Sequence, residues 1–203
     1  MKIALIGATG FVGSALREEA LGRGHELVAI ARRLDGLPAD PRLAARPVDL
    51  TNVAALTSAL RGVDVALVAV RYDGTDMERV LSAVREARVP RTLFIGGAGS
   101  LRNPAGVDLV DTPDFPALYK AEATAARAFL QRLRGETTLD WSYLSPSAAL
   151  LPGPRTGQFR LGADDVLIDA EGKSHISVAD LAVAALDEIA LPTHIRRRFT
   201  AGY

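Results

Sequence analysis

Short runs of apolar residues alternate along the chain with longer segments whose apolar residues recur every three or four positions. The runs are nearly continuous in Val, Ile, Leu and Ala, which is typical of strands buried on both faces of a parallel sheet. They predict strands over Lys2–Ile6, Glu26–Ala31, Ala45–Val48, Asp64–Val70, Thr92–Ile95 and Thr138–Ser145.

The segments between these strands carry signals for the start and end of helices. Thr75 with Glu78, and Ser177 with Asp180, have the spacing of a capping box, and Gly and Pro residues stand where helices should end. The predicted helices are Phe11–Leu21, Asn52–Leu60, Thr75 to about Arg88, Pro116–Arg134 and Ser177–Ile189. Strands that alternate with helices in this way predict right-handed crossovers and an α/β fold with a doubly wound parallel sheet.

The pattern loosens after Pro146. Residues 150–172 are rich in Gly, Pro, Asp and Arg and contain two short strand candidates, Gln158–Leu161 and Val166–Asp169. The tail Arg198–Tyr203 is predicted as a last strand. We therefore predict one Rossmann-type domain over residues 1–203, in which residues 146–203 supply a small lid on the substrate side and the last strand.

Composition limits the classes of partner. The 203 residues include 24 Lys and Arg against 24 Asp and Glu, so the charge gives no general reason to expect nucleic acid. The absence of cysteine excludes disulfides, thiolate catalysis and cysteine-ligated metals. Because the only histidines, His25, His175 and His194, are scattered, we predict no metal site.

No segment has the length and apolar character of a membrane span, and the apolar start Met1–Ile6 lacks the features of a signal peptide. We therefore expect a cytoplasmic protein that does not contact membranes and whose partner is a small molecule. The sequence leaves the oligomeric state open between monomer and homodimer.

A glycine-rich turn, Gly7-Ala8-Thr9-Gly10-Phe11-Val12-Gly13, joins the first predicted strand to the first helix. Glycine allows a tight turn and the approach of a pyrophosphate, and the helix N-terminus offers free N–H groups and a positive dipole end. We assign dinucleotide binding to Gly7, Thr9, Gly10, Phe11, Val12 and Gly13, and expect a positive φ at Gly10. The alternative is a turn whose glycines serve packing alone.

The motif GATGFVGSAL, with its Gly-x-x-Gly-x-x-Gly spacing, resembles the corresponding motif in the extended and atypical branches of the short-chain dehydrogenase/reductase superfamily. Three later segments, Gly96–Leu101, Trp141–Pro146 and Gly157–Gly162, resemble small NAD(P)H-flavin reductases close to the NmrA-like group. The resemblance spans nearly the whole chain. It implies a Rossmann-type oxidoreductase with a nicotinamide cofactor.

The residues after the second strand indicate which cofactor is used. An NAD-specific site needs a carboxylate there for the ribose hydroxyls, whereas this strand ends in Arg32-Arg33 and no carboxylate follows until Asp35. Two guanidinium groups suit a 2′-phosphate, so we predict NADP, with NAD possible. The alternative is a pair of solvated surface arginines.

Three further strand ends are assigned to the cofactor. Asp49 and Leu50 close the third strand, where Asp49 lies beside the adenine or caps the following helix. Ala69 and Val70 close the fourth strand, where small residues let the chain pass close to the cofactor. Ser145 ends the sixth strand and Pro146 follows it, at the edge of the sheet where Arg71–Asp73 and Gly96–Leu101 also arrive and where the substrate is expected to react.

The resemblance to the superfamily implies a catalytic serine and tyrosine, with a lysine four residues after the tyrosine that lowers its pKa. Ser100 and Tyr119 are the candidates here, but Ala123 occupies the lysine position and Lys120 faces another side of the helix. The alternatives are a capping role for Ser100 and a packing role for Tyr119. The usual proton-transfer pair is therefore missing.

A few other side chains have an expected place. Phe159 in the lid is the better candidate for stacking on a flavin ring, whereas Trp141 is expected in the core. His175 is expected in a solvated loop, and Arg196–Arg198 as a solvated run.

These features together predict an NADPH-dependent reductase whose acceptor is flat and conjugated, such as free flavin or a quinone. Flavin would be a substrate rather than a prosthetic group. A missing proton-transfer pair is compatible with such acceptors because they delocalise charge and can take a proton from water. The alternatives are a non-catalytic protein that senses NAD(P), and an enzyme resembling nucleotide-sugar epimerases or dehydratases.

Overall fold

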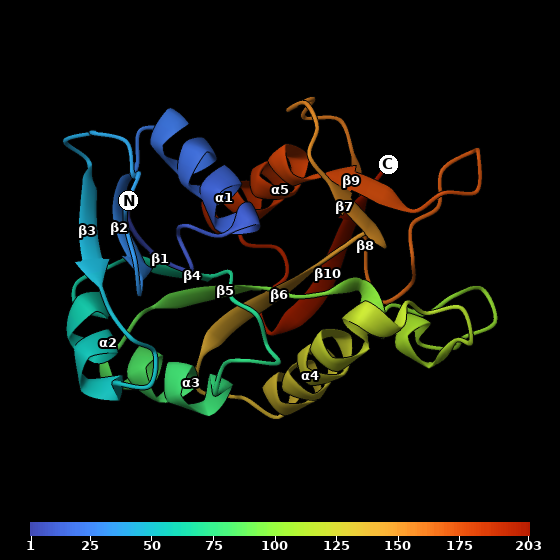
Figure 1. The fold of residues 1–203 in the computed structure, drawn as a ribbon, viewed down its shortest axis with the longest axis horizontal. Coiled ribbons are helices and arrows are strands. Elements are labelled where there is room, and N and C mark those ends of the chain that lie inside the picture. The colour runs from blue at the N-terminus through green and yellow to red at the C-terminus, as the bar shows by residue number, and fades with distance from the viewer.

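The computed structural model describes residues 1–203 and is built on one mainly parallel, eight-stranded sheet (Figure 1). The strand order is β3-β2-β1-β4-β5-β6-β10-β8, and only the pair β10–β8 is antiparallel. The strands are β1 (Lys2–Ile6), β2 (Glu26–Ala31), β3 (Leu43–Pro47), β4 (Val65–Val68), β5 (Arg91–Ile95), β6 (Asp140–Pro146), β8 (Arg160–Gly162) and β10 (Arg197–Gly202). This is the doubly wound, Rossmann-type arrangement that the sequence predicts.

Helices cover both faces of the sheet (Figure 1). Helices α1 (Phe11–Gly22) and α5 (Val178–Ala190) pack on one face; α2 (Val53–Leu60), α3 (Met77–Glu86) and α4 (Ala117–Arg134) pack on the other. Ile3 and Leu5 belong to the apolar core under α1 and α5, whereas Ala4 and Ile6 belong to the core on the opposite face. The strands read as continuous apolar runs because both of their faces are buried.

The predicted elements are confirmed except in four places. Val166–Asp169 forms no strand, and two short strands that the sequence did not predict, β7 (Ala149–Leu151) and β9 (His175–Ser177), pair as a separate small sheet. The N-cap of α3 is Asp76 rather than Thr75, because the Asp76 carboxylate accepts the N–H groups of Glu78 and Arg79.

None of the helices combines the length and apolar character that crossing a bilayer requires.

The segment between β7 and β8 crosses over α1 and α5 in an extended conformation. Arg155 makes two bonds to the Glu19 carboxylate at 2.7 and 2.9 Å, and buried Asp180 accepts the N–H groups of Thr156 and Gly157 at 2.8 Å each. The Tyr203 hydroxyl donates to the same Asp180 carboxylate at 2.7 Å. The segment predicted as a lid is thus fastened by hydrogen bonds and ion pairs to two helices and the chain terminus.

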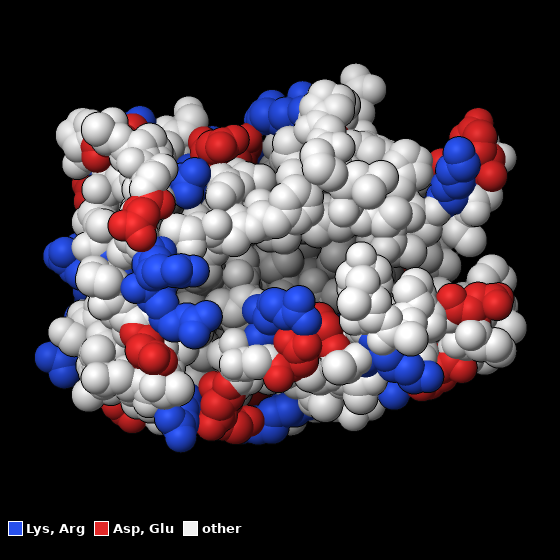
Figure 2. Space-filling view, viewed as in Figure 1, with Lys and Arg blue, Asp and Glu red and all other residues white.

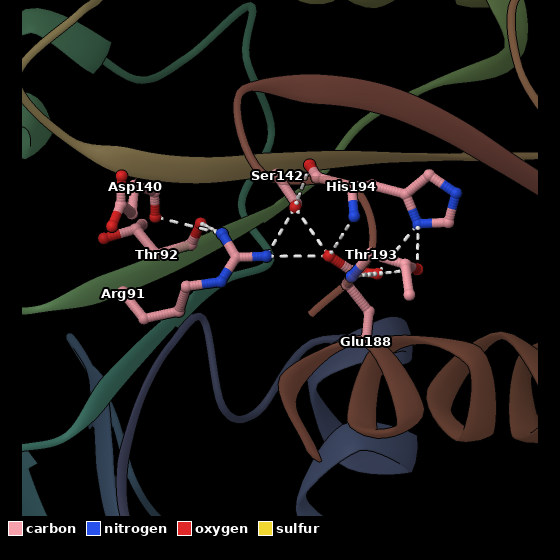
Figure 3. Close-up of polar contacts among 7 residues, drawn as sticks. All are labelled: Arg91, Thr92, Asp140, Ser142, Glu188, Thr193 and His194. Carbon is pink, nitrogen blue, oxygen red and sulfur yellow. Dashed lines mark hydrogen bonds and ion pairs between the residues drawn. The ribbon is translucent and has the colours of Figure 1, made fainter. Parts of the chain in front are cut away.

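A group of polar residues, which we call the amino-end cluster, joins the amino ends of β5 and β6 to the turn after α5 (Figure 3). It comprises the buried residues Arg91, Ser142 and Glu188 together with Thr193 and His194 of the turn. The Glu188 carboxylate accepts from the Arg91 guanidinium at 2.8 Å and from the Ser142 hydroxyl at 3.0 Å. It also accepts the backbone N–H groups of Thr193 and His194, at 3.2 and 2.9 Å. The cluster satisfies a buried carboxylate almost entirely with protein donors.

The expectation of a solvated run at Arg196–Arg198 is wrong for Arg198. Its side chain is buried, pairs with Asp164 and donates to the backbone oxygen of Ser100 at 3.2 Å. Neighbouring residues of a strand point to opposite faces of the sheet, so one arginine of the run must enter the α4 side as β10 pairs with β6.

Candidate functional site

The carboxyl ends of β1, β2, β3 and β4 surround a cavity of about 550 Å³. Figure 2 shows a groove across this face, with basic side chains along its left part and largely uncharged surface along its upper right wall. Nine of the predicted cofactor residues line the cavity: Gly7, Thr9, Gly10, Arg32, Arg33, Asp49, Leu50, Ala69 and Val70. The remaining lining residues are Ile30, Ala31, Val48, Thr51, Arg71, Asp73, Gly74, Thr75 and Asp76.

The glycine turn forms the floor of the cavity, and each glycine has its own reason. Gly7 has a φ of +89°, and a Cβ there would lie 2.1 Å from the Ala69 carbonyl oxygen. A Cβ at Gly13 would lie 2.0 Å from the Gly7 carbonyl oxygen, so this glycine lets the helix approach the turn. Gly10 has a φ of −75°, which corrects the expected positive value, and a Cβ there would meet only the Gly7 carbonyl oxygen, at 3.4 Å.

The start of α1 offers unused hydrogen-bond donors beside this space. Ser14 is the first residue of the helix whose N–H reaches a backbone acceptor, the Gly10 oxygen at 2.8 Å. The N–H groups of Phe11, Val12 and Gly13 have no partner in the protein. Free N–H groups at the positive end of a helix dipole are suited to bind phosphate.

Arg32 and Arg33 are exposed at the end of β2 and line the cavity. Neither guanidinium makes a hydrogen bond or an ion pair within the protein. The nearby Asp49 carboxylate accepts the N–H and hydroxyl of Thr51, at 2.9 and 2.8 Å. These bonds, helped by the charges of Arg32 and Arg79, lower the pKa of Asp49.

Asp49 therefore does not cap the following helix, which answers one alternative that the sequence left open. The N-cap of α2 is Asn52, whose side chain accepts the Ala55 N–H at 3.0 Å. Asp49 instead holds the turn between β3 and α2 along the cavity wall.

The loop after β4 supplies a wall of the cavity that the sequence assigned to the substrate side. Arg71 and Asp73 line it, and the Arg71 guanidinium bonds both carboxylate oxygens of Asp73, at 3.0 and 2.7 Å. The sequence could have indicated this role, because Arg71 directly follows the predicted strand Asp64–Val70, as Arg32 directly follows Glu26–Ala31.

Five other predicted cofactor residues do not line this cavity. Phe11 is exposed at the first position of α1, Val12 packs against the core under α1, and Gly13 is buried against Gly7. Ser145 and Pro146 are buried at the end of β6, and the Ser145 hydroxyl has no hydrogen-bond partner. A contact from Phe11, Val12 or Gly13 to a ligand would therefore come through the backbone.

The two predicted catalytic residues lie in different surroundings, and no hydrogen bond joins them. Ser100 is only 7% exposed, in a 3-10 turn over Ala98–Ser100, and its hydroxyl lies 3.3 Å from the Arg198 guanidinium. Tyr119 is 59% exposed in the first turn of α4, and its hydroxyl has no partner in the protein. Ser100 thus has a structural contact, whereas Tyr119 is free to meet a ligand.

The position four residues after Tyr119 is a buried alanine in close contact with the 3-10 turn. Ala123 is buried, and a Cβ added at Gly99 would lie 2.6 Å from the Ala123 Cβ, so helix and 3-10 turn are in close contact there. Lys120 is exposed and makes no bond to Tyr119. Ala123 therefore serves the packing of α4 against this turn, and no lysine stands beside Tyr119.

The remaining expectations are tested by burial. Trp141 is in the core, as predicted, with its indole N–H donating to the Glu136 oxygen at 3.2 Å. Phe159 is partly buried against the core under α1 and α5. His175 is not a free loop residue, because it lies on β9 with its Nε2 2.9 Å from Asp169.

These residues fit a dinucleotide. The turn offers free N–H groups suited to a pyrophosphate, and the guanidinium groups of Arg32 and Arg33, which have no partner in the protein, line the same cavity. When bound, such a cofactor supplies a hydride. The residues that would hold its phosphates are those of the glycine turn and of the end of β2.

Comparison with known proteins agrees with this arrangement. The model of a family described as NAD(P)H-binding matches residues 7–189, which includes the glycine turn and every helix of the chain except the last residue of α5. An uncharacterised Bacillus subtilis protein, YwnB, is 35% identical over 98% of this chain and 97% of its own length.

Two solved structures are similar over the whole chain. A candidate epimerase from Bacteroides thetaiotaomicron is 39% identical, with a TM-score of 0.96, over 100% of this chain and 96% of its own. A candidate NADH-flavin reductase from Streptococcus pneumoniae is 31% identical, with a TM-score of 0.83, over 100% of this chain and 99% of its own.

Proposed function

We propose that the hydride acceptor of this protein is flat and conjugated, either free flavin or a quinone. The chain belongs to the NAD(P)H-binding family and is an NAD(P)H-dependent reductase. We further propose NADPH as the preferred cofactor, since Arg32 and Arg33 line the cavity without protein partners. The cytoplasm is the proposed location.

One observation carries the choice of acceptor. Tyr119 has no basic partner, and the position four residues later, which the family resemblance gives to lysine, is the buried Ala123 packed against Gly99. Reduction of a ketone needs a proton for the developing alkoxide, and a tyrosine without a cationic neighbour is a weak donor of that proton. A flavin or quinone delocalises the incoming charge and takes its proton from water, so it requires less of the protein.

The chemistry balances without another reactant. The dinucleotide loses a hydride and becomes oxidised, and the acceptor gains that hydride and then a proton from water. The protein binds both molecules, holds their reacting faces together and keeps the phosphates at the Arg32 end of the groove.

The test is NADPH oxidation by the purified protein with a panel of FMN, riboflavin, quinones and ketones, together with calorimetric binding of NADPH. We expect turnover with at least one flavin or quinone and little with ketones. Turnover with ketones alone would refute the proposed acceptor class. NADPH binding without turnover of any acceptor would favour a sensing protein instead.

An epimerase is the second candidate because the similar Bacteroides protein is described as one. An epimerase moves a hydride from its sugar to the oxidised dinucleotide and back, so a nucleotide sugar added with NAD+ or NADP+ would be converted without net formation of the reduced dinucleotide. That result, combined with no oxidation by flavins or quinones, would replace our proposal.

A further inference from the structure

The loop that follows β4 is irregular in structure but lines much of the cofactor cavity. Its residues Arg71, Asp73, Gly74, Thr75 and Asp76 all face the cavity. A loop of this kind holds a binding shape only if something outside it fixes its backbone, because free loops lose conformational entropy on ordering.

The fixing contacts come from α4, about fifty residues later in the chain. One carboxylate oxygen of Glu122 accepts the Tyr72 N–H at 3.0 Å, and the other accepts the Asp73 N–H at 2.9 Å. The Tyr72 side chain is anchored beneath the loop, where its hydroxyl donates to the Ile95 oxygen at 2.8 Å. The Arg71 guanidinium, bonded to Asp73, lies 3.9 Å from Glu122.

This pair of contacts requires a carboxylate. Two N–H donors meet two acceptor oxygens of one group, whereas a glutamine offers a single acceptor oxygen and would leave one N–H facing a donor. Partial burial disfavours the charged form of Glu122 and raises its pKa, with Asp73 close by. Burial therefore works against the charged form of Glu122, whereas the two N–H groups of the loop stabilise it.

We propose that Glu122 is a positioning residue for the dinucleotide, which holds residues 71–76 in the shape that receives the cofactor and ties that wall to α4. This inference rests on the proposed function only in taking the cavity as the dinucleotide site. Tyr119 stands one helical turn before Glu122, so the carboxylate also joins the cofactor wall to the helix that borders the acceptor end.

The experiment compares wild type with Glu122→Gln and Glu122→Asp by NADPH calorimetry and by amide hydrogen exchange at Tyr72 and Asp73. Loss of one charge-assisted bond should weaken NADPH binding about tenfold in Glu122→Gln and speed exchange at both amides. Glu122→Asp keeps two acceptor oxygens and should recover part of the affinity. With the best acceptor, KM for NADPH should rise more than kcat falls.

Glu78→Gln is the matched control. Glu78 lies on α3, pairs with Arg132 at 2.8 Å and does not line the cavity. Its loss should change neither NADPH affinity nor exchange in the loop. An equal loss of affinity in this control would overturn the proposal.

Two further results would contradict it. The first is binding of NADPH by Glu122→Gln as tight as by wild type, with or without faster amide exchange. The second is weakened binding in Glu122→Gln with no recovery in Glu122→Asp, although both variants melt like wild type. If Glu122→Gln does not fold, the Asp variant decides alone, and normal affinity with faster exchange overturns the proposal. Wild type that binds no dinucleotide would instead refute the proposed function.

Discussion

Arg91 and Arg32 are both arginines at the terminus of a strand in the main sheet, but they lie at opposite ends of it. Arg91, at the amino end, is buried and donates to Glu188, to the Ser142 hydroxyl and to the backbone oxygens of Thr92 and Asp140. Arg32, at the carboxyl end, is exposed in a cavity and donates to nothing in the protein.

The difference separates a stabilising charge from a binding charge. Breaking a buried and hydrogen-bonded ion pair leaves its partner uncompensated, so it costs several kcal/mol of stability. An exposed arginine without partners contributes little to folding and keeps its donors for a ligand. The amino-end cluster is therefore expected to hold the fold together, and the carboxyl-end cavity to bind the cofactor.

Arg91→Met should have the largest effect on stability, about 3–5 kcal/mol, because it leaves the Glu188 carboxylate buried without its guanidinium partner. Urea unfolding measures this, and NADPH affinity should stay unchanged. Arg32→Met is the matched control, with the opposite expectation: a change in stability within about 0.5 kcal/mol and weaker NADPH binding. Similar stabilities for the two variants would refute the comparison.

Acid should weaken the amino end through Glu136, which precedes β6 and pairs with Arg85. Burial alone would raise the pKa of Glu136, but hydrogen bonds from Thr138 and Arg85 outweigh it and lower the pKa to about 2. The folded-state pKa is below the unfolded value, so this stability is present above pH 4.5 and is lost as pH falls toward 2.

The full contribution of Glu136 is about 3 kcal/mol. Urea unfolding from pH 6 to pH 2.5 should show a gap between wild type and Glu136→Gln that narrows below pH 4.5. Glu171→Gln, at an exposed carboxylate without an ion pair, should follow wild type throughout. A gap that does not depend on pH would contradict this assignment.

Gly10→Val should abolish measurable NADPH binding, a loss of at least about a hundredfold or 2.7 kcal/mol, because the side chain occupies the space of the pyrophosphate. With a φ of −75° at Gly10, valine causes little backbone strain, so the variant should fold. Gly22→Val, at the other end of α1 with open space around it, is the control and should bind normally. Thermal melts with and without NADPH decide, and normal stabilisation of Gly10→Val would show that the turn does not hold the phosphates.

Tyr119→Phe should have the smallest effect, lowering kcat with a flavin or quinone by less than about a hundredfold, the lower bound for general acid–base groups. The reason is that its exposed hydroxyl has no partner to activate it. Steady-state kinetics with the best acceptor measures this. A thousandfold drop at unchanged NADPH affinity would make Tyr119 a true acid and carbonyl reduction the leading function.

Much of the fold could be predicted because local signals and tertiary packing agree. The strands β1, β2 and β4 are continuous apolar runs buried on both faces, and Ser177 caps α5 by accepting the Asp180 N–H. The short strands β7 and β9 were missed because three residues carry too little pattern and they pair only with each other across a distance in the chain.

The candidate site divides in the same way. Gly7 and Arg32 could be assigned because they directly follow predicted strands, and Ala69 because it lies at the end of one, where a parallel sheet binds its ligand. Glu122 and the burial of Arg198 could not, because both depend on contacts with residues far away in the sequence: the loop after β4 and Asp164. No local spacing marks such partners.

Calorimetric titration of NADPH and NADH into wild type and Arg32→Asp tests the central claim, that the unpaired arginines at the carboxyl end receive the cofactor's additional phosphate. Charge-assisted hydrogen bonds to that phosphate contribute about 1.5–3 kcal/mol, so wild type should bind NADPH about tenfold to a hundredfold more tightly than NADH. Arg32→Asp should lose this preference while melting at the wild-type temperature. Equal affinities in wild type, or undiminished NADPH binding in the variant, would contradict the account.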